Sequence, residues 1–533
     1  MNAVVGDPQV MNLSALLAQT AAQFPDRPGL IQGERQWTWR EINARVDALV
    51  AALRGLGMQP GDKLLVQSRN GLPLFESCWA AFRLGAVWVP TNFRLTPPEV
   101  AYLGASSEAT VMLCEDVFPE HIDAVRAESK HLRHVLTIGS PRAGELDYEA
   151  LLAQHAGAPT DMATVTAEQV LWYFYTSGTT GRPKAGMLTH GQLAFVVTNH
   201  LADLIPGTRE TDCSIAVAPL SHGAGIHALL NVARGAATVL LPSERMDPAE
   251  VWRLIEQHRV SNLFTVPTIV KLLVEHPAVD QHDHSSLRYF IYAGAPMYRA
   301  DQKLALQKLG PVLVQYFGLG EVTGCITVLP AHMHSADDAD PNANIGSCGR
   351  PRTGMEVAIL DAQMQRVPTG TVGEICCRGP AVFAGYFNNE DATAKALRGG
   401  WFHTGDLGRM DERGLLYITG RESDMYISGG SNVYPREVEE VLLTHPAVVE
   451  VAVLGVPDEK WGEVGVAVVV SRDPALTPEA LLAHLDGRCA KYRWPRHIFF
   501  WDALPKSGYG KITKKDVRQM LYDRGDLTPF TNP

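Results

Sequence analysis

The chain has 533 residues, of which 46% are hydrophobic and 20% are charged, and its formal net charge at pH 7 is −11. This length is sufficient for two or more domains with full cores, and the composition is ordinary for a globular protein. The negative charge argues against non-specific binding to nucleic acid. It leaves open a small charged substrate, which responds to the local field.

The cysteines and the N-terminal residues indicate in which cellular compartment the protein is expected. The eight cysteines are scattered without a CxxC pair, which predicts reduced thiols rather than disulfides or a metal site. No Lys or Arg precedes Arg27, so the basic start of a signal peptide is missing. No apolar run reaches the roughly 18 residues that a membrane span requires. We therefore expect a cytoplasmic protein with no integral membrane segment.

Strand and helix patterns alternate at the start of the chain. Helical patterns at 13–24 and 40–53 are followed by a strand at 64–66, a helix at 72–84, a strand at 87–90, a helix at 97–105 and a strand at 111–113. Strands that alternate with helices of this length favour parallel sheets in a doubly wound α/β arrangement.

A loop rich in glycine and hydroxyl residues follows the apolar run 170–174, which reads as a buried strand. Residues 175–184 are Tyr-Thr-Ser-Gly-Thr-Thr-Gly-Arg-Pro-Lys. Glycine lets backbone N–H groups approach an anion, the hydroxyls add donors, and Lys184 adds a mobile positive charge. The loop is not a Walker A motif, because Ala185 stands where the magnesium-binding Ser or Thr would be. We interpret it as a phosphate-binding loop.

The alternation resumes after this loop and gives way to hairpins near residue 345. Thr189 and Gln192 have the spacing of a capping box, which predicts the start of a helix at 191–204. Further strands are expected at 214–218, 237–241, 262–266, 289–292 and 312–317, with helices near 248–258, 268–275 and 300–309. The patterns at 356–360, 373–378 and 408–418 are typical of antiparallel hairpins and predict a small β-barrel-like part.

The last part of the chain has its own α+β pattern. Helices are expected at 435–443, 478–489 and 513–521, and strands at 448–454, 465–470 and 497–501. We place a hinge at 421–424, between a large domain of residues 1–420 and a small mobile domain of residues 424–533.

The loop at 175–184 resembles the phosphate-binding loop of the adenylate-forming superfamily, which includes acyl-CoA synthetases, peptide-synthetase adenylation domains and luciferases. In that family the loop holds the phosphates of ATP. The enzyme joins a carboxylate to AMP, releases pyrophosphate and usually passes the acyl group to a thiol. The resemblance implies an AMP-binding adenylation domain at 1–420 and a C-terminal lid at 424–533. It also implies phosphate-binding roles for Thr176, Ser177, Gly178, Thr179, Thr180, Gly181 and Lys184, and catalytic roles for the first and last of these.

Further segments resemble the family's nucleotide motifs and follow in the same order. Gly294, Ala295 and Pro296 resemble the segment that lies along the adenine, and Tyr316, Phe317, Gly318 and Gly320 resemble the segment that follows it. By this register Phe317 stacks on adenine and Glu321 helps to hold Mg²⁺. Asp406 and Arg421 would hold the ribose, with Ile418 at the same nucleotide site.

Gly320 departs from the family pattern, which usually has Thr at this position. Because the hydroxyl residues of the phosphate loop remain, we expect Gly320→Thr to be tolerated. A competing interpretation is that Gly318, Gly320 and Gly324 form a dinucleotide fingerprint after a strand. The residues that follow, 325–330, lack a helical pattern, and a Rossmann domain would need a helix there.

The acyl pocket is expected around the segment that starts at Leu220. His222 matches a bulky ring that the family places beside the carboxylate, and it is accordingly assigned a catalytic role. Gly223, Ala224 and Met297 offer space without a charge partner, which favours an apolar acid, either fatty or aromatic. The peptide-synthetase branch places an acidic residue in this segment to hold an ammonium group, so an α-amino acid is not expected. A second possible site, His282-Asp283-His284, has metal-binding residue types but no further ligands nearby in the sequence.

The C-terminal domain resembles the mobile lid of the family. Lys511, in a loop with two glycines, would neutralise charge between the attacking carboxylate and the α-phosphate. Gly429 and Gly430 match the residues that border the pantetheine tunnel of acyl-CoA synthetases. Ser423 stands at the family's pivot, which is usually Asp or Lys.

We therefore expect an ATP-dependent acyl-CoA ligase that uses ATP, Mg²⁺ and coenzyme A. Its partners would be small molecules and not nucleic acid. A homodimer and a lysine acetyltransferase that acts on Lys511 are compatible with the sequence. Two other classes stay open. The first is an adenylate-forming enzyme that does not use free CoA, either an acyl-AMP ligase that loads a carrier protein or a luciferase-like oxygenase. The second is a non-catalytic relative that only binds nucleotide. Consumption of free CoA separates the first of these from the expected ligase.

Overall fold

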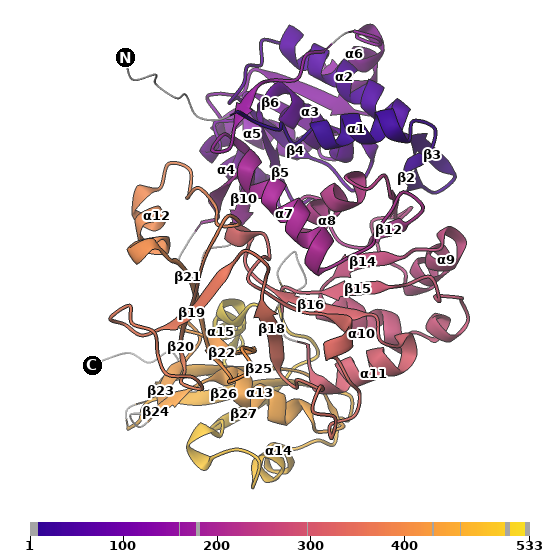
Figure 1. The fold of residues 1–533 in the computed structure, drawn as a ribbon. Coiled ribbons are helices and arrows are strands. Elements are labelled where there is room, and N and C mark those ends of the chain that lie inside the picture. Colours follow the sequence, from indigo (N-terminus) through magenta and orange to yellow (C-terminus); the bar gives the residue numbers. More distant parts are fainter. Residues whose placement is uncertain are drawn as a thin grey trace, which may run out of the picture.

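A computed structural model describes residues 9–158, 160–176, 182–295, 297–428, 431–458, 460–506 and 512–527. Three sheets organise these residues (Figure 1). They follow one another along the chain except that two early strands, at residues 28–32 and 35–38, belong to the second sheet. Two small elements, β1 (Gln9–Val10) and β9 (Val165–Thr166), pair with each other.

The first sheet has seven strands in the order β11-β10-β5-β4-β6-β7-β8. All neighbours are parallel except β10 and β11. Its strands are β4 (Lys63–Gln67), β5 (Val87–Pro90), β6 (Val111–Glu115), β7 (His134–Ile138), β8 (Leu146–Asp147), β10 (Val170–Thr176) and β11 (Lys184–Thr189). Its helices are α1 (Ala15–Gln23), α2 (Trp39–Gly55), α3 (Leu72–Leu84), α4 (Pro97–Ser106), α5 (Pro119–Glu128) and α6 (Tyr148–Gln154).

Helices cover both faces of this sheet, as a doubly wound arrangement requires. The buried residues of α2 and α3 share a core with Leu64 and Val66 of β4, whereas those of α4 and α5 share another core with Leu65. Because side chains alternate across a strand, these neighbouring residues of β4 point to opposite faces.

The second sheet has thirteen strands in the order β19-β20-β21-β22-β18-β17-β16-β15-β14-β12-β13-β2-β3. The strands from β16 to β2 in this order are parallel, and antiparallel strands extend the sheet at each end. The strands are β2 (Pro28–Gln32), β3 (Arg35–Thr38), β12 (Cys213–Ala216), β13 (Ala237–Leu240), β14 (Asn262–Thr265), β15 (Tyr289–Tyr292), β16 (Leu313–Phe317), β17 (Thr327–Leu329), β18 (Ser347–Pro351), β19 (Glu356–Leu360), β20 (Gly373–Arg378), β21 (Phe402–Met410) and β22 (Leu416–Arg421).

Helices also pack on both faces of the parallel part of this sheet. The buried residues of α9 (Pro248–His258), α10 (Pro267–Glu275) and α11 (Arg299–Leu309) form one core with the strands. Those of α7 (His190–Asp203) and α8 (Gly223–Val232) belong to the core that α2 and α3 share with the first sheet. Figure 1 accordingly shows α7 and α8 between the two sheets. The short helix α12 (Glu390–Ala396) lies near β21.

The third sheet belongs to the C-terminal part and has helices on both faces. Its strands are β23 (Tyr426–Ser428), β24 (Ser431–Val433), β25 (Val448–Asp458), β26 (Gly462–Ser471) and β27 (His497–Phe500). The helices α13 (Pro435–Leu443) and α14 (Pro478–Leu485) share one core with it, and α15 (Lys514–Asp523) shares another. Arg436 of α13 donates to the Ile418 carbonyl of β22 at 3.1 Å, which ties this part to the second sheet.

The expected α/β class, with a large N-terminal part and a smaller α+β C-terminal part, is confirmed. The capping box of Thr189 and Gln192 is present at the start of α7, as expected. Two differences stand out. The expected helix 478–489 ends earlier, at Leu485, because the chain turns at Gly487, whose φ is +72°. The predicted barrel-like hairpins are part of the long second sheet, which β18 joins to the parallel strands.

The expected hinge region lies between two sheets. β22 of the second sheet ends at Arg421, and β23 of the third sheet begins at Tyr426. The residues between them form a turn, with the Asp424 N–H donating to the Arg421 carbonyl at 3.1 Å. The domain limits 1–420 and 424–533 remain a prediction. Within the described residues, no helix is long and apolar enough to cross a bilayer.

Candidate active site

The phosphate loop connects two strands of the first sheet that run antiparallel. β10 and β11 pair so that Thr176 lies opposite Lys184. The residues between them that were predicted to bind phosphate, Ser177, Gly178, Thr179, Thr180 and Gly181, lie outside the described residues. The strand pairing therefore brings the first and last predicted residues of the loop to one place at the edge of the sheet.

Glu321 lies at the centre of a cluster that joins three distant parts of the chain. Its Oε1 accepts hydrogen bonds from Thr176 Oγ1 at 3.2 Å and from the Tyr386 hydroxyl at 2.7 Å. Lys184 Nζ lies 4.6 Å from the centroid of the Tyr386 ring. Glu321 is only 6% exposed. A carboxylate beside a hydroxyl supplies the oxygen ligands that Mg²⁺ prefers.

Tyr386 is a site residue that the sequence reasoning missed. The segment that carries it runs beside β11, where the Phe387 N–H donates to the Ala185 carbonyl at 3.0 Å. Burial raises the pKa of Tyr386, and the charge of the neighbouring Glu321 carboxylate raises it further. The phenol is therefore a protonated donor at neutral pH. Tyr386 belongs to no helix or longer strand and forms only an isolated bridge with Gly186 of β11, so its local sequence carries no periodic signal.

Tyr386→Phe should slow formation of the acyl-adenylate about tenfold or more, because one hydrogen bond to a charged group is worth about 1.5–3 kcal/mol. The measurement is pyrophosphate release at several Mg²⁺ concentrations. We expect the loss to be largest at low Mg²⁺, since Glu321 is the proposed magnesium ligand. Tyr289→Phe is the matched control, because its hydroxyl donates to the Pro206 carbonyl at 2.6 Å, outside this cluster. Equal rates for wild type and Tyr386→Phe would contradict the role of Tyr386.

The two predicted ribose ligands contact each other. Asp406 of β21 and Arg421 of β22 are strand partners, and Arg421 Nε lies 3.1 Å from Asp406 Oδ1. Asp406 is only 5% exposed, whereas the Arg421 side chain is 45% exposed. A buried carboxylate with an accessible guanidinium beside it can accept hydroxyls and contact a phosphate or ribose oxygen. Ile418 lies on the same strand as Arg421.

Glu374 of β20 supports the part of β21 that carries Asp406. Its carboxylate accepts from the Gly405 N–H at 3.2 Å and from Arg398 Nη2 at 2.9 Å, and His403 Nδ1 lies 2.7 Å from it. Glu374, Cys376 and His403 could also be read as metal ligands, since their ligand atoms lie within 4.8 Å of one another. Both oxygens of the Glu374 carboxylate already accept hydrogen bonds, one from Gly405 and the other from Arg398. We therefore infer that Glu374, Cys376 and His403 position this part of β21.

Gly320 makes room for an aromatic ring. A Cβ atom at this position would come within 2.7 Å of the Phe174 ring and 3.0 Å of Thr176 Cγ2. Phe174 is only 4% exposed, and its ring centroid lies 4.3 Å from that of His222. The ring therefore fills the space over Gly320 and contacts the predicted acyl pocket.

This geometry overturns the expectation that Gly320→Thr is tolerated. Overpacking of a filled site typically costs about 1–3 kcal/mol, so we expect Gly320→Thr to lower the melting temperature and the rate of pyrophosphate release. The double variant Gly320→Thr, Phe174→Leu should regain most of the loss, because the smaller side chain vacates that space. Phe174→Leu alone is the control. If Gly320→Thr is as stable and active as wild type, Phe174 moves aside without cost.

The segments predicted to lie near adenine occupy the ends of β15 and β16. Gly294 has a φ of +84°, so the chain turns there directly after β15. Gly318 follows β16, and a Cβ there would come within 2.4 Å of Gly324 Cα. The described residues after Gly318 form a short 3₁₀ turn, Gly320–Val322, and then β17. The dinucleotide interpretation is therefore wrong, because residues 318–330 form a 3₁₀ turn and a strand and not the α-helix of a βαβ unit.

The predicted acyl-pocket residues separate into two places. His222 directly precedes α8, with Gly223 and Ala224 in its first turn, and a Cβ on Gly223 would meet Phe264 at 2.8 Å. Met297 packs instead against the core of α9, α10 and α11. Two further aromatic residues, Phe317 and Tyr316, belong to β16, and Tyr316 is only 7% exposed.

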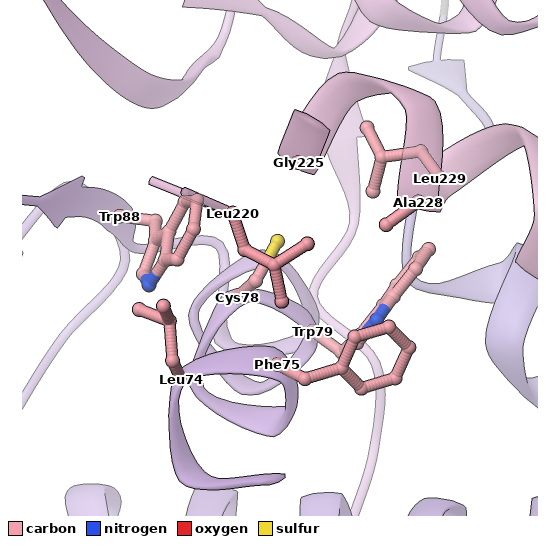
Figure 2. Close-up of a pocket in the computed structure, with 9 residues that line it drawn as sticks. All are labelled: Leu74, Phe75, Cys78, Trp79, Trp88, Leu220, Gly225, Ala228 and Leu229. Atoms are coloured by element: carbon pink, nitrogen blue, oxygen red, sulfur yellow. The ribbon is translucent and has the colours of Figure 1, made fainter. Parts of the chain in front are cut away.

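Two cavities lie beside α8. Figure 2 shows the first, between α3 and α8, where apolar side chains and one cysteine converge from both helices and from β5. Its lining consists of Leu74, Phe75, Cys78, Trp79, Trp88, Leu220, Gly225, Ala228 and Leu229. The second cavity lies between α8 and the strands β12, β13 and β14, and it shares Leu220 and Ala228 with the first. Ala224 of the predicted pocket lines this second cavity.

Several predicted residues lie outside the described residues. They are Pro296, Gly429, Gly430 and Lys511, together with the five phosphate-loop residues named above. Ser423 is described and exposed, in the turn after β22. At the possible His282-Asp283-His284 metal site, His282 Nδ1 lies 2.7 Å from Glu256 Oε2 and the Asp283 N–H donates to the same carboxylate. These contacts are those of a surface loop held to α9.

Comparison with known proteins adds the family to this geometry. A family described as AMP-binding enzyme matches residues 17–387, and one described as AMP-binding enzyme C-terminal domain matches residues 437–511. The chain belongs to the family of AMP-binding enzymes. The resemblance of its loops to the adenylate-forming superfamily, acyl-CoA synthetase branch, is thereby confirmed.

Relatives of this AMP-binding enzyme extend over nearly the whole chain. A feruloyl-CoA synthase from Amycolatopsis is 38% identical, over 94% of this chain and 97% of that protein. An indoleacetate–CoA ligase from Aromatoleum aromaticum is 33% identical, over 96% of this chain and 98% of that protein. The solved structure of an anthranilate CoA ligase in complex with anthranoyl-AMP has a TM-score of 0.88 and 26% identity, and the match covers 98% of this chain and 99% of that one.

Proposed function

We propose that this AMP-binding enzyme is an ATP-dependent acid–CoA ligase. It activates a carboxylic acid as acyl-AMP with release of pyrophosphate, and it then transfers the acyl group to CoA with release of AMP. The observation that carries the proposal is the cluster of Thr176, Lys184 and Glu321 on one edge of the first sheet. The family membership and the CoA ligases among its relatives support it.

In the first step the chain holds ATP and the acid for in-line attack of the carboxylate on the α-phosphate. Asp406 and Arg421 bind the ribose, and Lys184 with Thr176 contacts the phosphates. Glu321 is the residue that would hold Mg²⁺, which supplies charge neutralisation between the phosphates when bound. Lys511 neutralises the charge between the two reacting groups. The carboxylate oxygen forms the new P–O bond, and pyrophosphate leaves.

In the second step the CoA sulfur attacks the acyl carbonyl, its proton goes to solvent, and the bond to AMP breaks. Gly429 and Gly430 leave room for the pantetheine arm. Rotation of residues 424–533 about Ser423 exchanges the groups that close the site between the two steps. The domain limits belong to this proposal, as do binding of CoA and Mg²⁺.

The apolar cavity between α3 and α8 favours an acid without a second charge, because its described lining offers no charged group. Two features of the same proposal concern partners. Two copies would associate as a homodimer, tested by light scattering. A lysine acetyltransferase that acetylates Lys511 would inhibit the first step, because acetylation removes the positive charge of this residue.

The test is AMP formation by the full chain with ATP, Mg²⁺ and CoA across a panel of carboxylic acids. We expect thioester to appear with AMP in equal amounts. Acyl-AMP that accumulates without consumption of CoA would favour loading of a carrier protein or oxygenation. If the protein binds nucleotide but converts none of the acids, it is a non-catalytic relative.

A further inference from the structure

The helix α4 contacts the segments that carry the proposed phosphate-binding residues, and it is itself firmly held. At its start the Thr96 N–H donates to the Glu99 carboxylate at 2.7 Å, as in a capping box. A Cβ on Gly104 would come within 2.8 Å of Val125, so the absence of a side chain lets α4 approach α5 closely. The buried residues of both helices share a core with β4. α4 is therefore a fixed support beside the first sheet.

The first contact of α4 is with the end of β10. The Tyr175 hydroxyl lies 2.8 Å from Ser106 Oγ and donates to the Leu103 carbonyl at 3.3 Å. Burial raises the pKa of Tyr175, so the phenol keeps its proton at neutral pH. Because side chains alternate across a strand, Tyr175 faces α4 while the next residue, Thr176, faces Glu321. The bond to α4 therefore fixes the backbone from which the Thr176 hydroxyl reaches Glu321.

The second contact is with the residues that directly precede β11. The Tyr102 hydroxyl donates to the Pro183 carbonyl at 3.1 Å. The Arg182 guanidinium lies 5.1 Å from the centroid of the Tyr102 ring, which is a cation–π contact. Pro183 is followed by Lys184, whose ammonium lies over the ring of Tyr386. Tyr102 thus holds the start of β11 by both its hydroxyl and its ring.

A third contact involves the segment that carries Tyr386. Asn388 Nδ2 donates to Glu108 Oε1 at 3.1 Å, and Glu108 lies just beyond the end of α4. Between Tyr386 and Asn388, the Phe387 ring packs on Tyr173 of β10 with centroids 4.9 Å apart. The C-terminal end of α4 therefore contacts all three segments that meet at the proposed phosphate site.

The contacts with β10 and with the start of β11 come from one face of α4. Tyr102, Leu103 and Ser106 are neighbours on that face, because residues three and four apart lie side by side on a helix. A group that is held in place before its ligand arrives loses less freedom on binding and so gives a higher affinity. Attachment of both strands to one fixed helix supplies such preorganisation.

We propose that Tyr102 and Tyr175 are positioning residues for the phosphates of ATP. They hold Thr176 and Lys184 at the spacing that the polyphosphate needs, and neither phenol contacts the nucleotide. The inference rests on the proposed acid–CoA ligase function and deepens it. It separates the phosphate part of nucleotide binding, which depends on α4, from the adenosine part, which does not.

The experiment titrates the full chain calorimetrically with MgATP and with adenosine, which lacks the phosphates. In Tyr102→Phe and in Tyr175→Phe we expect the dissociation constant of ATP to rise about fivefold or more, the effect of losing one neutral hydrogen bond. The dissociation constant of adenosine should be unchanged. In turnover, KM for ATP should rise in the same way, while KM for the acid and the conversion of a pre-made acyl-adenylate by CoA should match wild type.

Tyr173→Phe is the matched control. It removes a hydroxyl from the same strand, two residues from Tyr175, and keeps the ring that packs on Phe387, so both dissociation constants should match wild type. Ser106→Ala should weaken ATP binding less than Tyr175→Phe, since the Leu103 carbonyl still accepts from Tyr175. This variant tests the contact even if a tyrosine variant fails to fold.

Equal loss of affinity for ATP and adenosine, or unchanged affinity for ATP in the folded variants, would overturn the positioning role, whatever the melting temperatures. The titration needs no turnover. A wild-type protein that binds ATP but converts no acid would therefore refute the ligase function, while the two tyrosine variants would still decide the positioning role.

Discussion

Lys511→Ala should slow acyl-adenylate formation by about 10²–10³-fold or more, the effect of losing one preorganised charge at a developing anion. The proposed partners of Lys511 are the attacking carboxylate and the α-phosphate, and both matter only in the first step. Conversion of a pre-made acyl-adenylate by CoA should therefore stay nearly normal. The two rates are measured separately, by pyrophosphate release and by thioester formation.

Lys515→Ala is the matched control for this variant. Lys515 is exposed in the first turn of α15, and its substitution removes the same charge from the same end of the chain. We expect Lys515→Ala to behave as wild type in both steps. If Lys511→Ala slows both steps equally, Lys511 serves structure or CoA binding, and its assignment to the first step is wrong.

Ser423→Pro should abolish the overall reaction while the protein still folds and binds ATP. A hinge needs only backbone dihedrals that are free to change, and many residue types allow this. Proline holds φ near −65° and restricts the preceding residue, Glu422, whose N–H donates to the Gly405 carbonyl at 3.0 Å. The variant should be trapped in one half-reaction, with pyrophosphate released and no thioester formed.

Ser423→Ala distinguishes the hinge from the side chain. The Ser423 hydroxyl donates to the carboxylate of the neighbouring Asp424 at 3.4 Å, and the residue is exposed, so loss of the hydroxyl should leave activity close to wild type. If the Ser423→Pro enzyme makes acyl-CoA at the full rate, the hinge lies at another residue. Asp424→Pro would then be the variant to test.

Features that depend on contiguous residues were well predicted from the sequence. The strand at 170–174, the capping box of Thr189 and Gln192, and the helix Leu72–Leu84 all follow from local periodicity or from side chains within one turn. The order of the motifs likewise identified the family. The strands β2 and β3 at one end of the second sheet were missed, because short segments gain their stability from pairing with other strands rather than from a local pattern.

The sequence by itself determined the fold class, the family and the residues that we propose bind ATP, since each lies in a short segment with its own pattern. Only the tertiary structure decided which of these residues touch. The packing of strands and turns puts Tyr386 on Glu321 and fills the space over Gly320 with the Phe174 ring. These contacts join residues far apart in the chain, and their geometry depends on how the sheets pack, which no local pattern encodes.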